Sequence, residues 1–234
     1  MRPHSLTLPI CLFILFIQFD VFGQQRKPPA GGRLAVVVDE RLSALRSTPQ
    51  LAGKLVRRLS RGRLVAITGV KTTADGIIFY RVNVTSRTRG WLQRESVVSR
   101  SRAGDDERLL RLIQTSHGFD RIFRAKIFLD HFHRSPIRPQ VLLILGDTAE
   151  ELSAKLPRIN NDALEAPEFT YYLNHSSLDR FNRQGVHFIF DRSTKRLHYD
   201  GAAYRLLIRH HPNSPEARIA RQRLSGMRQQ PDKL

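Results

Sequence analysis

Arginine and aromatic side chains gather in two segments of the first half of the chain. One group comes just before an apolar run and the other lies close to the tryptophan; the set comprises Arg57, Arg58, Arg61, Arg63, Arg87, Arg89, Tyr80 and Trp91. Guanidinium groups bind phosphate and carboxylate through paired hydrogen bonds. If these segments fold into one small sheet, the arginines form a basic rim around an aromatic residue, which predicts a binding site for anionic groups. The alternative is that Tyr80 and Trp91 belong to the core.

The histidines do not have the spacing of a metal site. His131 and His133 are two residues apart, and on a helix this spacing turns their side chains about 200° away from each other. A solvated or turn position explains this pair better, and the same holds for His210 and His211. We therefore expect no metal ligands.

Candidate acid–base pairs are also better explained as solvated helix positions. Asp147 precedes Glu150 and Glu151 in a segment that also carries apolar residues at helical spacing. The sequence has no glycine-rich phosphate loop and no Gly-x-Ser-x-Gly elbow. These observations predict a protein that is not an enzyme, with no catalytic residues and no cofactor.

The first 23 residues have the plan of a cleavable secretory signal peptide. Arg2 supplies the early positive charge, residues 6–19 form a largely apolar run, and the small residue at Gly23 places cleavage there. The apolar run is interrupted and shorter than the roughly 20 residues of a membrane-spanning helix, so an uncleaved anchor is the less favoured alternative. Cleavage would remove Cys11, the only cysteine, and leave a mature chain without thiols or disulfides.

Positive charge is concentrated in the first part of the mature chain. The sequence carries a net charge of +18; residues 33–102 hold 15 Lys and Arg against 4 Asp and Glu, a net of +11, and residues 103–234 hold 21 against 16, a net of +5. In an exported protein this predicts a polyanionic envelope partner, such as anionic lipid or cell-wall polymer, and disfavours nucleic acid. A GC-rich genome that supplies arginine at solvated positions is the competing explanation.

Hydrophobic patterning predicts a β region near the start of the mature chain. Residues 24–32 are polar and rich in proline and glycine, which indicates a flexible linker. Between residues 33 and 102, about five short β-branched and aromatic runs are separated by turn residues. The run at 77–84 alternates, with Tyr80 on one side and Arg81 on the other.

From residue 103 the period becomes helical. Acidic residues from Asp105 mark the start of a first helix, and a second is expected from Phe119. Pro139 suits the first turn of a third helix. A fourth helix is expected over residues 168–184.

Particular motifs in residues 33–102 resemble those of bacterial SH3-type domains. They are the Leu45-Arg46-Ser47 element, the strand around Phe79 and Tyr80, and the pair Gly90-Trp91 followed by a Ser-Val end. The resemblance implies a small, partly open β-barrel that binds cell-wall peptides or protein partners and does not catalyse a reaction.

The helical part contains an internal repeat. Residues 128–136 align with residues 207–215 at an offset of 79, so that a helix, a Ser-Pro turn and a second helix recur. With Leu145-Gly146-Asp147, this pattern resembles the tetratricopeptide-type repeats of envelope proteins such as outer-membrane assembly lipoproteins. The offset exceeds two repeats of about 34 residues, which predicts an irregular insertion near residues 160–167.

The sequence thus predicts an exported multi-domain β + α protein. A small SH3-like β-barrel at 33–102 is followed by an all-α tetratricopeptide-like helical-hairpin domain at 103–234. The leading hypothesis is a non-enzymatic adaptor that binds protein or peptide partners in the bacterial cell envelope. The alternative is a module that docks on peptidoglycan or anionic lipid through the arginines of its first domain. A cell-wall hydrolase is a third, weaker possibility.

Overall fold

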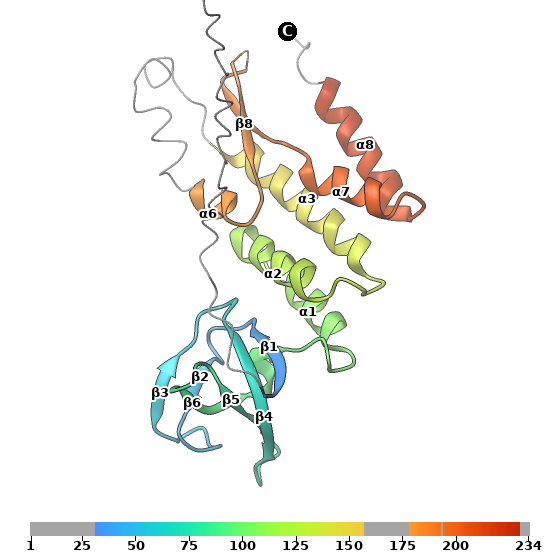
Figure 1. The fold of residues 1–234 in the computed structure, drawn as a ribbon. Helices are drawn as coiled ribbons and strands as arrows, with labels where there is room; N and C mark the ends of the chain where they lie inside the picture. Colours follow the sequence, from blue (N-terminus) through green and yellow to red (C-terminus); the bar gives the residue numbers. More distant parts are fainter. Residues whose placement is uncertain (1–30, 157–177, 193, 230–234) are drawn as a thin grey trace, which may run out of the picture.

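The computed structural model describes residues 31–156, 178–192 and 194–229 (Figure 1). Within them the chain builds an antiparallel sheet first and a series of helices afterwards, so the protein is a mixed β and α structure. The expected signal peptide and most of the expected linker lie outside the described residues. Among the described helices, none combines the length and the hydropathy needed to cross a membrane.

Seven short strands form the main sheet. They are β1 (Arg33–Val37), β2 (Ala44–Arg46), β3 (Leu55–Arg58), β4 (Leu64–Thr72), β5 (Ile78–Asn83), β6 (Arg89–Gln93) and β7 (Val97–Val98). Their order in the sheet is β3-β2-β6-β5-β4-β1-β7, and every pairing is antiparallel. The edges are β3 and β7, which do not pair with each other, so the sheet does not close into a barrel.

Alternation along β5 places one set of side chains in the core of the sheet. Tyr80 and Val82 are buried and Arg81 is exposed, which confirms the pattern expected from the sequence. Phe79 departs from it, because the loop with Pro49 and Leu51 lies beside that side chain. The core is completed by apolar residues of the other strands: Ala35, Val37, Leu45, Leu59, Val65, Ile67, Val84, Leu92 and Val97.

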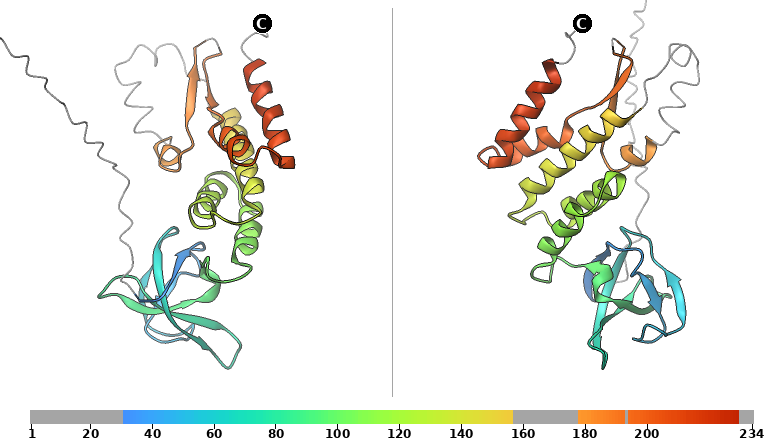
Figure 2. Two further views of the ribbon diagram at one scale, coloured as in Figure 1. Left: turned by 45° about the vertical axis from the view of Figure 1, so that its right-hand side comes forward. Right: turned by 180° about the vertical axis from the view of Figure 1, so that it is seen from behind.

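Among the described residues, five helices lie in succession beyond the sheet, with a single helical turn beside them (Figure 2). They are α1 (Asp105–Gln114), α2 (Gly118–His131), α3 (Arg138–Lys155), α7 (Ala202–His210) and α8 (Pro215–Gln229), and the single turn is α6 (Asp179–Asn182). The helices packed together are α1 with α2, α2 with α3, α3 with α7 and α7 with α8. The three helices expected from residue 105, from residue 119 and around Pro139 are confirmed.

Only the last part of the fourth expected helix lies among the described residues. Residues 168–177 lie outside the described residues, and in the remaining segment only Asp179–Asn182 is helical. The chain then turns at Gly185, whose φ of 72° suits glycine, and enters a strand.

A β-hairpin in the second half corrects the prediction of an all-α region. Strands β8 (Phe188–Asp191) and β9 (Arg196–Tyr199) pair with each other, and β9 contacts α3. Leu197 and Tyr199 point into the helical core, because alternate residues of a strand face the same side.

The two aligned segments of the internal repeat are both helix–turn–helix units. In the first, α2 ends at His131 and α3 begins at Arg138; in the second, α7 ends at His210 and α8 begins at Pro215. The connections differ by two residues, so Pro215 starts its helix whereas Pro136 comes before α3. The repeat is therefore irregular at its turns.

The hydrophobic core of the helices extends to one side of the sheet, apart from the sheet's own core. Val36, Val38 and Val98 lie in the same cluster as the buried side chains of the helices. Arg108 of α1 donates to the Glu95 carbonyl oxygen at 2.9 Å. The sheet therefore forms one wall of the helical region.

Candidate anion-binding face

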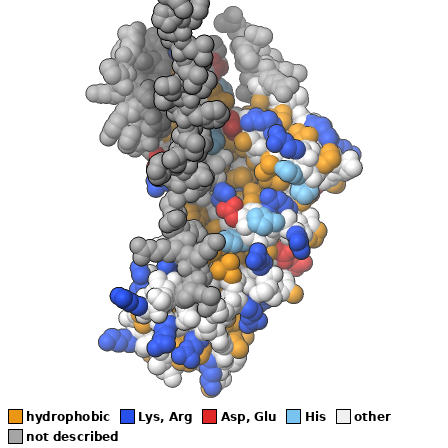
Figure 3. Space-filling view, in the orientation of Figure 1, with side chains coloured by type: hydrophobic (Ala, Val, Ile, Leu, Met, Phe, Trp, Pro, Cys, Tyr) orange, Lys and Arg blue, Asp and Glu red, His pale blue; other side chains and the backbone are white. Residues whose placement is uncertain are grey.

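Four of the six arginines expected at a binding site are exposed. Arg57 and Arg58 belong to the edge strand β3, Arg87 lies in the turn between β5 and β6, and Arg89 is the first residue of β6. Lys and Arg side chains recur across the part of the molecule formed by the sheet (Figure 3). These four guanidinium groups are accessible to a partner in solution.

Arg61 instead connects the sheet to the helices. Its Nη1 and Nη2 atoms donate to Asp120 Oδ1 and Oδ2 at 2.8 and 3.3 Å, and its side chain is only 13% exposed. The hydrogen bond from Arg61 holds the pKa of the Asp120 carboxyl below its usual value. The guanidinium also lies 5.8 Å from the centre of the Phe123 ring. Arg61 is therefore occupied by a structural role.

Arg63 is also engaged within the fold. Its Nη2 atom donates to the Val84 carbonyl oxygen at 3.2 Å, which ties the start of β4 to the end of β5. We therefore separate Arg61 and Arg63 from the four exposed arginines.

The structure places the two aromatic residues on opposite faces of the sheet. Tyr80 pairs with Leu92 across β5 and β6, and both are buried in the sheet core. Trp91, one residue earlier on β6, is only partly buried and faces the other side. The geometry does not bring Tyr80 and Trp91 together, and only Trp91 can meet a ligand on the exposed side.

Trp91 lies between two arginines that the sequence did not single out. It pairs with Arg46 of β2 on one side and with Arg81 of β5 on the other. Directly opposed residues of antiparallel strands share a face, so the three side chains form a row. The next position along this row is Gly69 of β4, which adds no side chain. We call this surface the outer face and define it by Arg46, Arg81 and Trp91.

Gly90 allows strands β2 and β6 to lie close together beside this row. A Cβ atom added at Gly90 would lie 2.6 Å from the Arg46 carbonyl oxygen and 3.0 Å from Leu45 Cγ. Because glycine has no Cβ, β2 and β6 can approach at this point. Arg46 is held further by its donation from Nη1 to the Gly53 carbonyl oxygen at 2.8 Å.

The acids on α3 are not simply solvated, which corrects the expectation for two of them. Tyr204 Oη lies 2.7 Å from Asp147 Oδ1 and 2.9 Å from Glu150 Oε2, and its single proton is donated to one carboxylate at a time. Arg223 donates to Asp147 at 3.2 Å. Burial first, and then the neighbouring carboxylates, raise the pKa of the Tyr204 hydroxyl. Glu151 is exposed, as expected.

The histidines do not assemble into a metal site in the described part of the chain. No group of three or more His, Cys, Asp or Glu side chains there has the arrangement of metal ligands. His131 is half-buried and burial lowers its pKa, whereas His133 is exposed.

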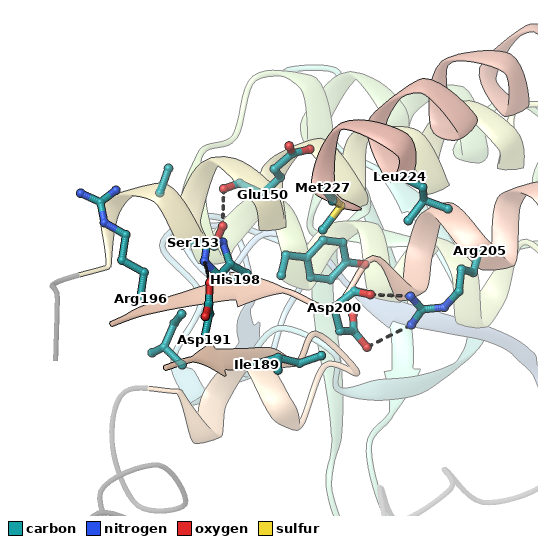
Figure 4. A pocket seen from close by; sticks show the side chains of 13 residues that line it. Glu150, Ser153, Ile189, Asp191, Arg196, His198, Asp200, Arg205, Leu224 and Met227 are labelled. Atoms are coloured by element: carbon teal, nitrogen blue, oxygen red, sulfur yellow. Dashed lines mark hydrogen bonds and ion pairs between the residues drawn. The ribbon is translucent and has the colours of Figure 1, made fainter. Parts of the chain in front are cut away.

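A cavity of about 420 Å³ lies between the hairpin and helices α3, α7 and α8 (Figure 4). Ile189, Leu224 and Met227 give it apolar surface, and the Ile189 side chain is 61% exposed. An ion pair between Asp200 and Arg205, 3.4 Å long, lies on the same wall. The cavity can accept an apolar group with a polar neighbour.

The fold and the outer face together define a mixed β and α protein with an exposed basic sheet beside a row of helices. Comparison of the chain with protein-family models, with curated proteins and with solved structures gives no match. The function is therefore argued from the site itself.

Proposed function

We propose that this protein is an exported, non-enzymatic binding protein of the bacterial cell envelope that docks on an anionic cell-wall polymer through its sheet. The observation that carries the proposal is Trp91 beside the exposed Arg81 on the outer face, together with the exposed arginines 57, 58, 87 and 89. Guanidinium groups pair with carboxylate or phosphate, and a flat indole beside them gives apolar contact to a polymer.

The charge balance of the sheet region supports this proposal. Only four acidic residues accompany the fifteen basic ones between residues 33 and 102. Among these four, Glu40 accepts from the Arg61 backbone and Asp39 from Arg41. Few carboxylates therefore neutralise the exposed arginines on the strands. The electrostatic attraction between these arginines and an anionic partner must weaken as the salt concentration rises.

The same proposal includes a relationship of the sheet to SH3-like domains and of the helices to tetratricopeptide repeats. Short antiparallel strands with a Gly-Trp pair at residues 90–91 favour an SH3-like domain, and two helix–turn–helix units favour tetratricopeptide-like packing. Gly146 adds to this, because it allows α3 and α7 to approach closely.

Co-sedimentation with purified sacculi tests the docking. One variant replaces Arg57, Arg58, Arg87 and Arg89 with glutamine, and we expect it to lose at least tenfold in affinity. Its matched control replaces four exposed arginines elsewhere, Arg111, Arg192, Arg209 and Arg218, and changes the net charge equally. Sacculi with amidated carboxylates should release the wild-type protein. Equal loss in both variants would show that binding depends on net charge and not on the sheet.

An adaptor for a protein partner is the second candidate, and the cavity beside the hairpin favours it. Ile189 exposes a large apolar side chain at this cavity, where an apolar residue of a partner peptide would bury it. If this candidate is correct, a defined envelope protein that cross-links to the full protein should no longer cross-link to the Ile189→Ser variant. Val70→Ser, at a residue 59% exposed on β4, serves as the control. Recovery of the same proteins with both variants would contradict this candidate.

A further inference from the structure

Two turns that are far apart in the sequence line an open, basic cavity of about 670 Å³. Arg100 and Arg102 come from the connection between β7 and α1, and His131, His133 and Arg134 come from the end of α2 and the turn that follows. Three arginines and two histidines thus line one cavity. A single carboxylate, that of Asp106, also lines it.

The nearby carboxylates are already bound within the protein. Asp106 Oδ2 accepts from Ser135 Oγ at 2.7 Å, across the two turns. Asp105, whose side chain is 3% exposed, accepts from the Ser99 backbone and pairs with Arg102 at 3.4 Å and Arg108 at 3.3 Å. Arg102 is thus partly neutralised. Arg100 and Arg134 remain exposed, so the cavity keeps an excess of positive charge.

His131 adds a further hydrogen-bond donor to the cavity. Burial lowers the pKa of His131; among its charged neighbours Asp130 opposes this shift, whereas His133, Arg100 and Lys126 increase it. At neutral pH an uncharged imidazole still has one N–H to donate. Protonation would add a charge beside the guanidinium groups.

We propose that this cavity binds a phosphate monoester. A phosphate dianion has three terminal oxygens, and several guanidinium and imidazole donors around one cavity match that number better than they match a single carboxylate. The volume lies within the usual range of ligand sites, about 300–1,000 Å³, and leaves room for the organic group of the ester. The site lies on residues other than those of the outer face, so the two are tested separately.

Isothermal titration of the full protein with glycerol 3-phosphate at low ionic strength tests the proposal. We expect saturable binding of one equivalent, and weaker binding of glycerate, which has a carboxylate in place of the phosphate. Arg100→Gln combined with Arg134→Gln should weaken glycerol 3-phosphate binding at least tenfold, since hydrogen bonds to charged groups are lost. Both positions are exposed, and circular dichroism would verify that the variant folds.

A control variant identifies the site, and an experiment with lipid vesicles identifies the source of the phosphate. Arg192→Gln combined with Arg218→Gln removes the same charge from two exposed positions elsewhere and should leave glycerol 3-phosphate binding unchanged. Sedimentation with phosphatidic acid vesicles, against phosphatidylcholine vesicles, shows whether a membrane headgroup also enters the site. Absence of saturable binding, or equal weakening by both double variants, would overturn the proposal.

Discussion

Gly146 is the position where the packing of the helices can be tested most sharply. A Cβ atom added there would lie 2.4 Å from Cε1, 2.7 Å from Cδ1 and 2.8 Å from Cζ of Tyr204. The Tyr204 side chain is fully buried and its ring carbons cannot move away freely. Gly146→Ala must therefore displace the ring, the helix that carries it, or both.

The size of the effect follows from three contributions. Overpacking a core costs about 1–3 kcal/mol. Displacing the ring also weakens the donation of its hydroxyl to Asp147 or Glu150, and a hydrogen bond to a charged group contributes about 1.5–3 kcal/mol. The lower end applies, because Asp147 is 40% exposed. Alanine is more favourable than glycine in a helix interior by about 1 kcal/mol, which offsets part of this loss. We expect a net loss of about 1.5–3.5 kcal/mol.

Urea denaturation of the purified protein measures this loss, and Gly226→Ala is its matched control. Gly226 lies within α8, and an added Cβ would meet no atom within 4 Å. This control should gain about 0.5–1 kcal/mol from helix propensity alone. If Gly146→Ala were stabilised by the same amount, the close approach of α3 and α7 at Tyr204 would be refuted.

Three further predictions concern titratable groups. Asp120→Asn should lower the free energy of unfolding by only about 1 kcal/mol, because the Asp120 side chain is 56% exposed and solvent screens its ion pair. Arg61 lowers the pKa of Asp120, so this contribution is present above about pH 3.9 and is lost below it. Urea midpoints measured across pH 2–6 would show the loss. Burial raises the pKa of Tyr204, so stability should fall as the pH rises above about 10, and less steeply in Tyr204→Phe. Sulfate, which remains a dianion, should bind the basic cavity more tightly as the pH is lowered and His131 becomes protonated, and His131→Gln should flatten this dependence in calorimetric titrations.

Much of the fold could be predicted where one periodicity runs over many residues. The alternation of β5 and the helical repeats of α1, α2 and α3 are of this kind. β2 and β3 were missed as strands because they have only three and four residues, and all four of β3 are exposed. Neither strand carries the inside–outside pattern that identifies a longer one.

The hairpin of β8 and β9 was missed for a different reason. Its turn contains Lys195 with a φ of 54°, a conformation that usually requires glycine or asparagine. The sequence therefore lacks the turn signal between its two apolar runs. The prediction of an all-α region failed because tertiary packing against α3 stabilises a turn that local preference disfavours.

The candidate site could be predicted only in part, because the positions of charged residues in the sequence do not show how the strands pair. Arg81 was expected on the side of the sheet opposite Tyr80, but its position beside Trp91 depends on the pairing of β5 with β6. Arg46 reaches the same row from β2, 45 residues away along the chain. Arg61 resembles Arg57 in the sequence, yet its partner lies 59 residues further on. Strand pairing and helix docking decide these roles.

This division of the arginines has a consequence that salt can test. Exposed charges such as Arg57 and Arg89 are screened over a Debye length of about 8 Å at 0.15 M salt, whereas partly buried pairs are screened less. The Arg61 side chain is 13% exposed and its guanidinium group is bonded to both oxygens of Asp120, so it belongs to the second kind. A polymer held by the outer face and the exposed arginines should be released at salt concentrations that leave the urea midpoint unchanged. Release that coincides with unfolding would instead show that docking depends on the same charges that join the sheet to the helices.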